Sequence, residues 1–114
     1  MRYIMFVCVD PEPDTSGDEG PSIDDWFDEI NPSGKWVLGE RLRPVEDAKL
    51  VRVRNGEVLV TDGAFTESKE WIGGFDILEC DSMDEATAIA SKHPMARGGR
   101  IEVREFWPLA ESDH

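Results

Sequence analysis

The fold expected for this chain rests on the stretch RYIMFVCV, Arg2 to Val9. Aromatic and β-branched side chains are typical of a strand, and alternation gives this strand two faces. One face carries Tyr3, Met5, Val7 and Val9, and the other carries Ile4, Phe6 and Cys8. Both faces are apolar, so the strand needs cover on both sides, whereas helices on one face of a small sheet supply only half of it.

The segments after this strand alternate between helix and strand signals. Ser22 is a candidate N-cap for a helix that stops near Asn31, because the residue before Pro32 resists helical angles. A capping box, Ser82 with Glu85, opens a second helix that runs through Lys92. Further strands are predicted at residues 35–43, 74–80 and 101–107.

A β-hairpin is predicted between the second strand and the third core strand. Residues 50–54, Leu-Val-Arg-Val-Arg, and 58–60, Val-Leu-Val, flank the dipeptide Asn55-Gly56. Asn-Gly supplies the positive φ angles that a tight type I′ turn requires.

The predicted order is therefore β-α-β, an inserted hairpin, then β-α-β. Right-handed crossovers place both helices on one face of one antiparallel sheet, with the first strand between the third and fourth core strands. We predict a ferredoxin-like α+β sandwich that forms a single domain over residues 1–114, with a flexible acidic loop at 10–21 and a tail at 108–114.

The apolar helix-free face of this sheet predicts a partner. Phe106 and Trp107 alternate in the predicted last strand and add to the same expectation. The economical cover is a second copy packed face to face as a C2 homodimer, a dimeric α/β barrel. Such a dimer can leave a cavity for a small molecule between the sheet and the loops.

Composition narrows the function classes. The chain has 114 residues and a net charge of −13, from 25 acids against 12 bases, and this charge disfavours direct nucleic-acid binding. No apolar run approaches the roughly 18 residues of a membrane helix. The N-terminus lacks a cleavage site for a signal peptide, so we expect a cytoplasmic protein with no membrane partner.

The loop after the hairpin supplies most candidate site residues. Asp62 precedes a glycine and is either a turn residue that bonds its own backbone or a carboxylate held in a partly dry cleft, where it acts as acid or base. The candidate substrate-binding residues beside it are Phe65, Glu67, Lys69, Glu70 and Trp71, together with Arg52 of the hairpin. The alternatives are a solvated charged loop, a core or dimer-contact tryptophan and a solvated arginine.

His93 is the second catalytic candidate. It ends the second helix, where imidazolium is favoured by the helix dipole, and it also titrates near neutral pH as a general base does. The chain has no G-x-S-x-G elbow, P-loop, dinucleotide fingerprint or metal-ligand spacing. We therefore expect no cofactor and no metal, which leaves acid–base chemistry or binding.

Several ordered motifs resemble the YCII-related family, in particular its DGPF branch. They are V-T-D-G-A-F at 60–65, I-G-G-F-D-I-L-E-C at 72–80, K-H-P at 92–94 and G-G-R-I-E-V-R at 98–104. Ala64 stands where the namesake motif has proline. The resemblance implies a ferredoxin-like fold that dimerises as an α/β barrel.

The resemblance also implies functions. Members of the wider family resemble small-molecule enzymes with a His–Asp pair in a cleft, but their histidine lies in the N-terminal third, where this chain has none. DGPF-type proteins are companions of extracytoplasmic-function sigma factors. Three hypotheses stay open: a homodimeric enzyme that binds a small polar or aromatic molecule near the Asp62 loop, a non-catalytic ligand-sensing or regulatory module linked to such sigma factors, and a scaffold with a filled cleft.

Overall fold

The computed structural model describes residues 1–10, 12–17, 20–62 and 72–109. Its strands are β1 (Arg2–Val9), β2 (Trp36–Arg41), β3 (Lys49–Arg54), β4 (Glu57–Asp62), β5 (Ile72–Glu79) and β6 (Gly99–Glu105). Its helices are α1 (Ile23–Ile30), α2 (Met83–Ser91) and the short α3 (Met95–Gly98), with a 3-10 turn η1 (Val45–Asp47). This order confirms the predicted β-α-β, hairpin and β-α-β sequence of elements.

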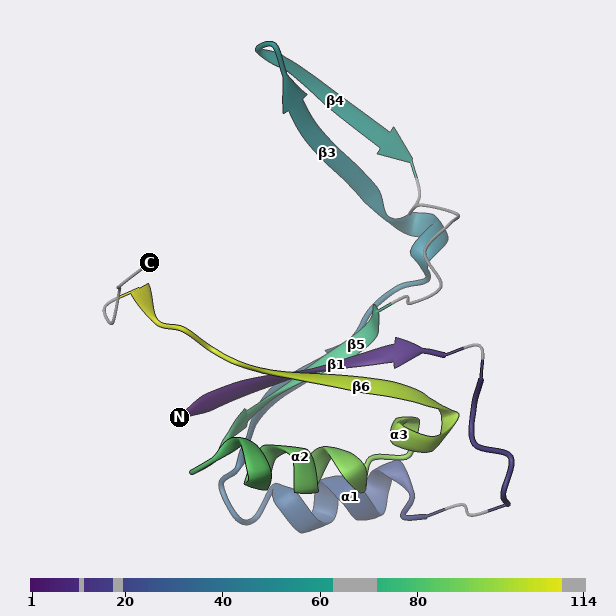
Figure 1. Cartoon of the computed structure of the whole chain (residues 1–114), viewed down its shortest axis with the longest axis vertical. Coiled ribbons are helices and arrows are strands. Elements are labelled where there is room, and N and C mark those ends of the chain that lie inside the picture. The colour runs from purple at the N-terminus through teal and green to yellow at the C-terminus, as the bar shows by residue number, and fades with distance from the viewer. Residues whose placement is uncertain (11, 18–19, 63–71, 110–114) are drawn as a thin grey trace.

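Four strands form one antiparallel sheet in the order β2-β5-β1-β6. Strand β1 lies between β5 and β6, as predicted from the order of elements and right-handed crossovers. The helices α1, α2 and α3 all lie on one side of this sheet (Figure 1). The architecture is therefore α+β and consistent with a ferredoxin-like fold.

Serine side chains begin both longer helices. Ser22 Oγ accepts a hydrogen bond from the Asp25 N–H, and Ser82 Oγ accepts one from the Glu85 N–H, each at 3.1 Å. These contacts satisfy N–H groups that have no partner inside the helix. The Glu85 carboxylate bonds to the Asp81 N–H and to Lys35 Nζ, so half of the predicted capping box forms as expected.

The core lies between the sheet and the helices. Its buried members are Tyr3, Met5, Leu78 and Cys80 from the strand side, and Trp26, Ile30, Ala86 and Ala90 from the helices. Strand β1 contributes one of its faces to this core. On its other face, Ile4 and Phe6 are only half-buried, so the helix-free side of the sheet remains partly open to solvent.

The hairpin β3–β4 forms a separate two-stranded sheet that reaches away from the body (Figure 1). Asn55 has a φ of 54° and Gly56 a φ of 77°, which is the pair of positive angles predicted for the Asn-Gly turn. We call residues 49–62 the arm.

The last strand differs from its predicted range. It begins at Gly99 and ends at Glu105, and the short helix α3 occupies Met95–Gly98, between the predicted second helix and the predicted last strand. The Phe106 N–H bonds to the carbonyl of Arg2, where β1 begins, so the sheet offers no further partner strand beyond that point. Trp107 lies outside the strand and is largely exposed.

The acidic loop predicted to be flexible has two anchors to the body. The Asp10 carboxylate pairs with Arg100 Nε at 2.9 Å, and the Asp14 N–H donates to the carbonyl of Arg97 at 2.9 Å. Among the described residues, none of the helices has the length and apolar character needed to cross a lipid bilayer.

Candidate functional site

A cavity of about 610 Å³ opens between the sheet and the N-terminal end of α1. Ligand pockets usually span about 300–1,000 Å³, so this volume suits a small molecule. Strands β1, β2 and β5 form one wall, and α1 with the segment before α3 forms the other. The residues that line the cavity include Trp26, Phe27, Trp36, Arg41, Phe75, Asp76, His93 and Met95.

Asp76 places a carboxylate in this cavity. It lies opposite Gly39 in the β2–β5 register, on the same face of β5 as the buried Leu78. Trp36 Nε1–H donates a hydrogen bond to Asp76 Oδ1 at 2.9 Å. A Cβ atom at Gly39 would overlap the same Oδ1 atom, so the carboxylate fits at this place only because residue 39 has no side chain. Two residues of β2 therefore orient Asp76.

His93 faces the cavity from the end of α2. Only 6% of the residue is exposed, and the edge of its ring packs against Trp26 with ring centroids 4.8 Å apart. The Met95 N–H donates to His93 Nδ1 at 3.0 Å. Because Nδ1 accepts this bond, the neutral ring carries its proton on Nε2 and presents an N–H donor.

The electrostatic environment keeps His93 neutral. Burial lowers the pKa of His93 below its ordinary value of 6.5, because an imidazolium loses solvation there, and the negative charge of Asp76 opposes this effect only in part. At pH 7 the cavity therefore contains an uncharged imidazole donor together with a carboxylate.

The remaining lining combines aromatic side chains with aliphatic residues, glycines and charged residues. Phe27 and Trp36 form a T-shaped pair with ring centroids 4.8 Å apart, and Trp26 adds a further ring. Arg41 is exposed and lies on the face of β2 that carries Gly39. The cavity thus combines flat apolar surfaces with a guanidinium at its exposed side, which suits a planar molecule that carries an anionic group.

Of the three predicted site residues that the structure describes, one lies in this cavity. His93 lines it, whereas Asp62 lies at the end of β4, with a side chain 85% exposed and paired with Lys49. Arg52 lies on the arm and is exposed. Asp62 and His93 are therefore not brought together, and a catalytic role for Asp62 and a binding role for Arg52 stay predictions.

The other predicted binding residues lie outside the described part of the chain. They are Phe65, Glu67, Lys69, Glu70 and Trp71.

Sequence reasoning missed Asp76 and Trp36. The strand IGGFDILE carries a signal that points to Asp76: alternation puts this carboxylate on the same face as Gly74 and Leu78, in an otherwise apolar segment. No local pattern points to Trp36, since its bond to Asp76 spans 40 residues and depends on the pairing of β2 with β5.

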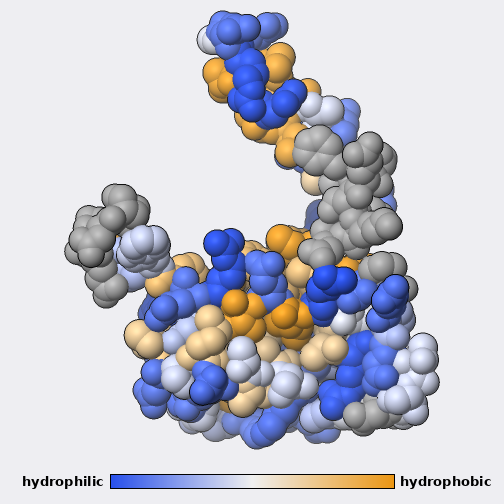
Figure 2. Space-filling view, in the orientation of Figure 1, coloured by the Kyte–Doolittle hydropathy of each residue, from blue (hydrophilic) through white to orange (hydrophobic). Residues whose placement is uncertain are grey.

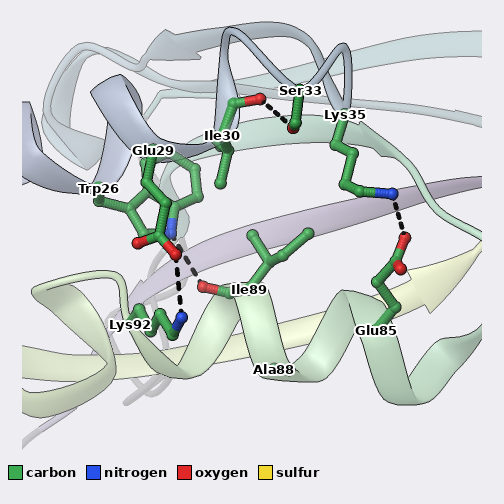
Figure 3. Close-up of a pocket in the computed structure, with 9 residues that line it drawn as sticks. All are labelled: Trp26, Glu29, Ile30, Ser33, Lys35, Glu85, Ala88, Ile89 and Lys92. Atoms are coloured by element: carbon green, nitrogen blue, oxygen red, sulfur yellow. Dashed lines mark hydrogen bonds and ion pairs between the residues drawn. The ribbon is translucent and has the colours of Figure 1, made fainter.

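A second, smaller hollow of about 240 Å³ lies between α1 and α2 (Figure 3). Lys35 Nζ pairs with Glu85 at 2.8 Å on one side of it, and Lys92 Nζ pairs with Glu29 at 3.0 Å on the other. Because these charged side chains pair with one another across the elements, they connect the helical layer and leave few groups for a ligand. Within the described ranges, no three His, Cys, Asp or Glu side chains are grouped to hold a metal ion.

Comparison with known proteins agrees with the resemblance seen in the motifs. A family model described as the YCII-related domain matches residues 1–110. An uncharacterised protein of Rhizobium meliloti (strain 1021) is 44% identical over 80 residues, which cover 68% of this chain and 62% of that relative, so the match spans less than two thirds of the relative's length. The chain belongs to the YCII-related domain family.

Proposed function

We propose that this protein binds a small planar molecule in the cavity between the sheet and α1, where Asp76 removes a proton from it and His93 stabilises the resulting negative charge. Asp76 accepts the proton through its carboxylate, which Trp36 orients. His93 donates a hydrogen bond from Nε2–H to the oxygen on which negative charge develops. The observation that carries this proposal is the presence of both groups in one cavity that also contains aromatic side chains.

The assignment of roles follows from hydrogen bonding. A general base needs a free lone pair, and Nδ1 of His93 already accepts a bond from the Met95 N–H. The Nε2–H group is a donor, so neutral His93 suits stabilisation of an oxyanion. Oδ2 of Asp76 remains as the acceptor for a substrate proton. The corresponding reaction class is proton abstraction next to a carbonyl group, with an enol or enolate as product.

Arg41 and the aromatic walls support the ligand class. A guanidinium binds a carboxylate with charge-assisted hydrogen bonds, and aromatic side chains stack on a flat ring. An aromatic 2-oxo acid contains all three features: a ring, a carboxylate and an acidic C–H beside a carbonyl.

Phenylpyruvate is a suitable probe for this chemistry. Exchange of its C3 protons with deuterated solvent, followed by proton NMR, reports proton abstraction without further reagents. We expect the wild type to accelerate exchange about 10²–10⁴-fold over buffer, which is the usual range for general acid–base catalysis. Asp76→Asn should remove this acceleration, and Arg41→Gln should raise the concentration needed for half-saturation.

Two variants make the test discriminating. Asp28→Asn makes the same chemical change on α1 outside the cavity lining and should retain wild-type exchange. Asp62→Asn tests the site that the sequence predicted, at the loop after the hairpin, against the cavity. Loss of proton exchange in Asp62→Asn, with exchange retained in Asp76→Asn, would refute the role given to Asp76. Wild-type exchange no faster than buffer, with no ligand-induced NMR shifts in cavity residues, would refute the proposed function for this ligand class.

The family branch and the partners belong to the same proposal. We place the chain in the DGPF branch on the sequence Asp62-Gly63-Ala64-Phe65, and we propose that it forms a homodimer through its helix-free sheet face. The half-buried Ile4 and Phe6 on that face support the dimer. The link to extracytoplasmic-function sigma factors is a prediction from the branch alone, which a pull-down from the native cell tests.

A further inference from the structure

The arm has one apolar face and one polar face. The β3–β4 register pairs Val51 with Val60 and Val53 with Val58, so these four valines share one face. The opposite face pairs Leu50 with Thr61, Arg52 with Leu59 and Arg54 with Glu57. The arm is therefore an amphipathic ribbon, which is the pattern of a strand pair that buries one side.

Nothing in the described part of the chain covers the valine face. The four valines are between 55% and 64% exposed. Two-stranded hairpins on their own are marginally stable in water. The radius of gyration of the chain is 16.6 Å, whereas a compact domain of this length has about 13 Å, consistent with an arm that stands away from the body.

The same chain contains a surface that matches the arm. The helix-free face of the sheet carries a strip of apolar side chains, formed by Ile4, Phe6, Leu38, Phe75 and Ile77. Figure 2 shows apolar surface on the arm and on the side of the body that faces it, across the open space between them. Among the described residues, the valine face of the arm is exposed, and the strip on the sheet is half-buried apart from the exposed Leu38. Each therefore lacks part of the cover that a strand face of this composition needs.

Charge favours contact between an arm and a second copy of this chain. The arm contains three bases and two acids, whereas the rest of the chain contains nine bases and 23 acids. A weakly basic ribbon is thus attracted to the acidic body of another copy, although two whole chains repel each other. Nucleic acid, the other partner that bases commonly bind, is disfavoured by the total charge.

We propose that the valine face of each arm packs on the helix-free sheet face of a second copy, so that two arms clasp the dimer. This inference rests on the homodimer proposed above and adds the element that forms its contact. A two-fold axis makes the exchange mutual, because each copy gives an arm and receives one. The cavity with Asp76 and His93 is built by one chain and does not depend on the clasp.

Sedimentation as a function of concentration tests the role of the valine face. A variant with threonine at positions 51, 53, 58 and 60 keeps β-branched side chains, so the hairpin retains its strand propensity while its apolar face becomes polar. We expect the dimer dissociation constant to rise by about 100-fold or more, as for loss of a central apolar contact.

Two neighbouring residues of β4 provide a matched pair of variants. Val60→Lys and Thr61→Lys each add one positive charge, on the valine face and on the opposite face respectively. Val60→Lys should weaken the dimer strongly, and Thr61→Lys should leave its dissociation constant within about threefold of the wild type, as for a rim position. Equal effects of the two variants would overturn the proposal.

A spin label locates the contact directly. Glu57→Cys places a labelling site near the arm tip on the polar face, and the two native cysteines, Cys8 and Cys80, are buried. Spin-labelled protein with natural isotopes is mixed with ¹⁵N protein that carries no spin label. Only the ¹⁵N copies give NMR signals, so line broadening reports contacts between copies. We expect broadening of residues on the helix-free face, such as Phe6 and Ile77. Broadening confined to α1 and α2 would refute the proposed contact.

These experiments distinguish failure of the clasp from failure of the homodimer and of the cavity chemistry. A wild type that stays monomeric removes both the dimer and the clasp, whereas a dimer that survives the four Val→Thr substitutions removes the clasp alone. Exchange of phenylpyruvate protons is a third, independent readout. The Val→Thr variant should retain it as a monomer if the single-chain cavity is the site.

Discussion

Gly39→Ala tests whether the room beside Asp76 is essential to the site. A Cβ atom at position 39 would overlap Asp76 Oδ1 and would lie 2.9 Å from the Phe75 carbonyl oxygen, whereas ordinary contact begins at 3.4 Å. The carboxylate can rotate away, but the Phe75 carbonyl belongs to the backbone of β5 and moves only with the strand. The substitution therefore displaces Asp76 and crowds the β2–β5 pair.

The expected loss of stability combines three effects. Loss of the hydrogen bond from Trp36 to the charged Asp76 carboxylate costs about 1.5–3 kcal/mol. Crowding of a packed site costs about 1–3 kcal/mol. Alanine restricts the unfolded chain more than glycine does and returns about 0.4–1 kcal/mol. We expect a decrease of about 2–4 kcal/mol in the free energy of unfolding, because the site is partly open to solvent.

Urea unfolding measures this change, and Gly73→Ala is the matched control. A Cβ atom at Gly73 would meet only the Val7 carbonyl oxygen, at 3.8 Å, so this variant should be as stable as the wild type or more stable by up to about 1 kcal/mol. NMR titration adds a second readout: with the Asp76 charge displaced, the pKa of His93 should fall further. Equal unfolding midpoints for the two variants, with an unchanged His93 titration, would refute the reasoning.

Three further predictions address the histidine, the helical layer and the arm. The pKa of His93 is lower in the folded than in the unfolded chain, so the unfolded chain takes up a proton first as the pH falls. Stability should therefore decrease as the pH drops through about 6.5. Measurement of Tm against pH should show a smaller decrease for His93→Gln than for the wild type. Trp26→Phe removes the Trp26 Nε1–H bond to the Ile89 carbonyl at 2.8 Å, which then keeps only the Lys92 N–H at 3.2 Å, and it also removes buried side-chain volume. It should cost about 1–3 kcal/mol in urea unfolding, whereas Lys92→Ala, which breaks a surface ion pair, should cost about 1 kcal/mol or less. Gly56→Ala puts a Cβ at a φ of 77° and should destabilise the arm by about 1–2 kcal/mol. Amide hydrogens of the arm should then exchange with solvent faster, while those of β1 keep their rates. Faster exchange in the arm and in β1 alike would contradict an independent arm.

Local rules predicted most elements of the fold. Period-two alternation identified the strand over Arg2–Val9, Ser22 and Ser82 marked the helix starts, and Asn55-Gly56 marked the hairpin turn. These signals act over a few residues, because alternation, caps and turn angles are properties of neighbouring backbone units. The end of β6 was misjudged, since that boundary depends on where β1 begins, far away in the sequence.

The residues of the chain alone specify the strands, the helices, the turn and their order, since each of these depends on a short-range preference of the backbone. The meeting of Asp76, Trp36 and His93 depends instead on the register between β2 and β5 and on how α2 ends over the sheet. The three residues lie 17 to 57 positions apart in the sequence, and only packing of the whole domain brings them into one cavity. The same packing leaves the arm as a separate sheet whose four valines are exposed, and local sequence patterns do not reveal this.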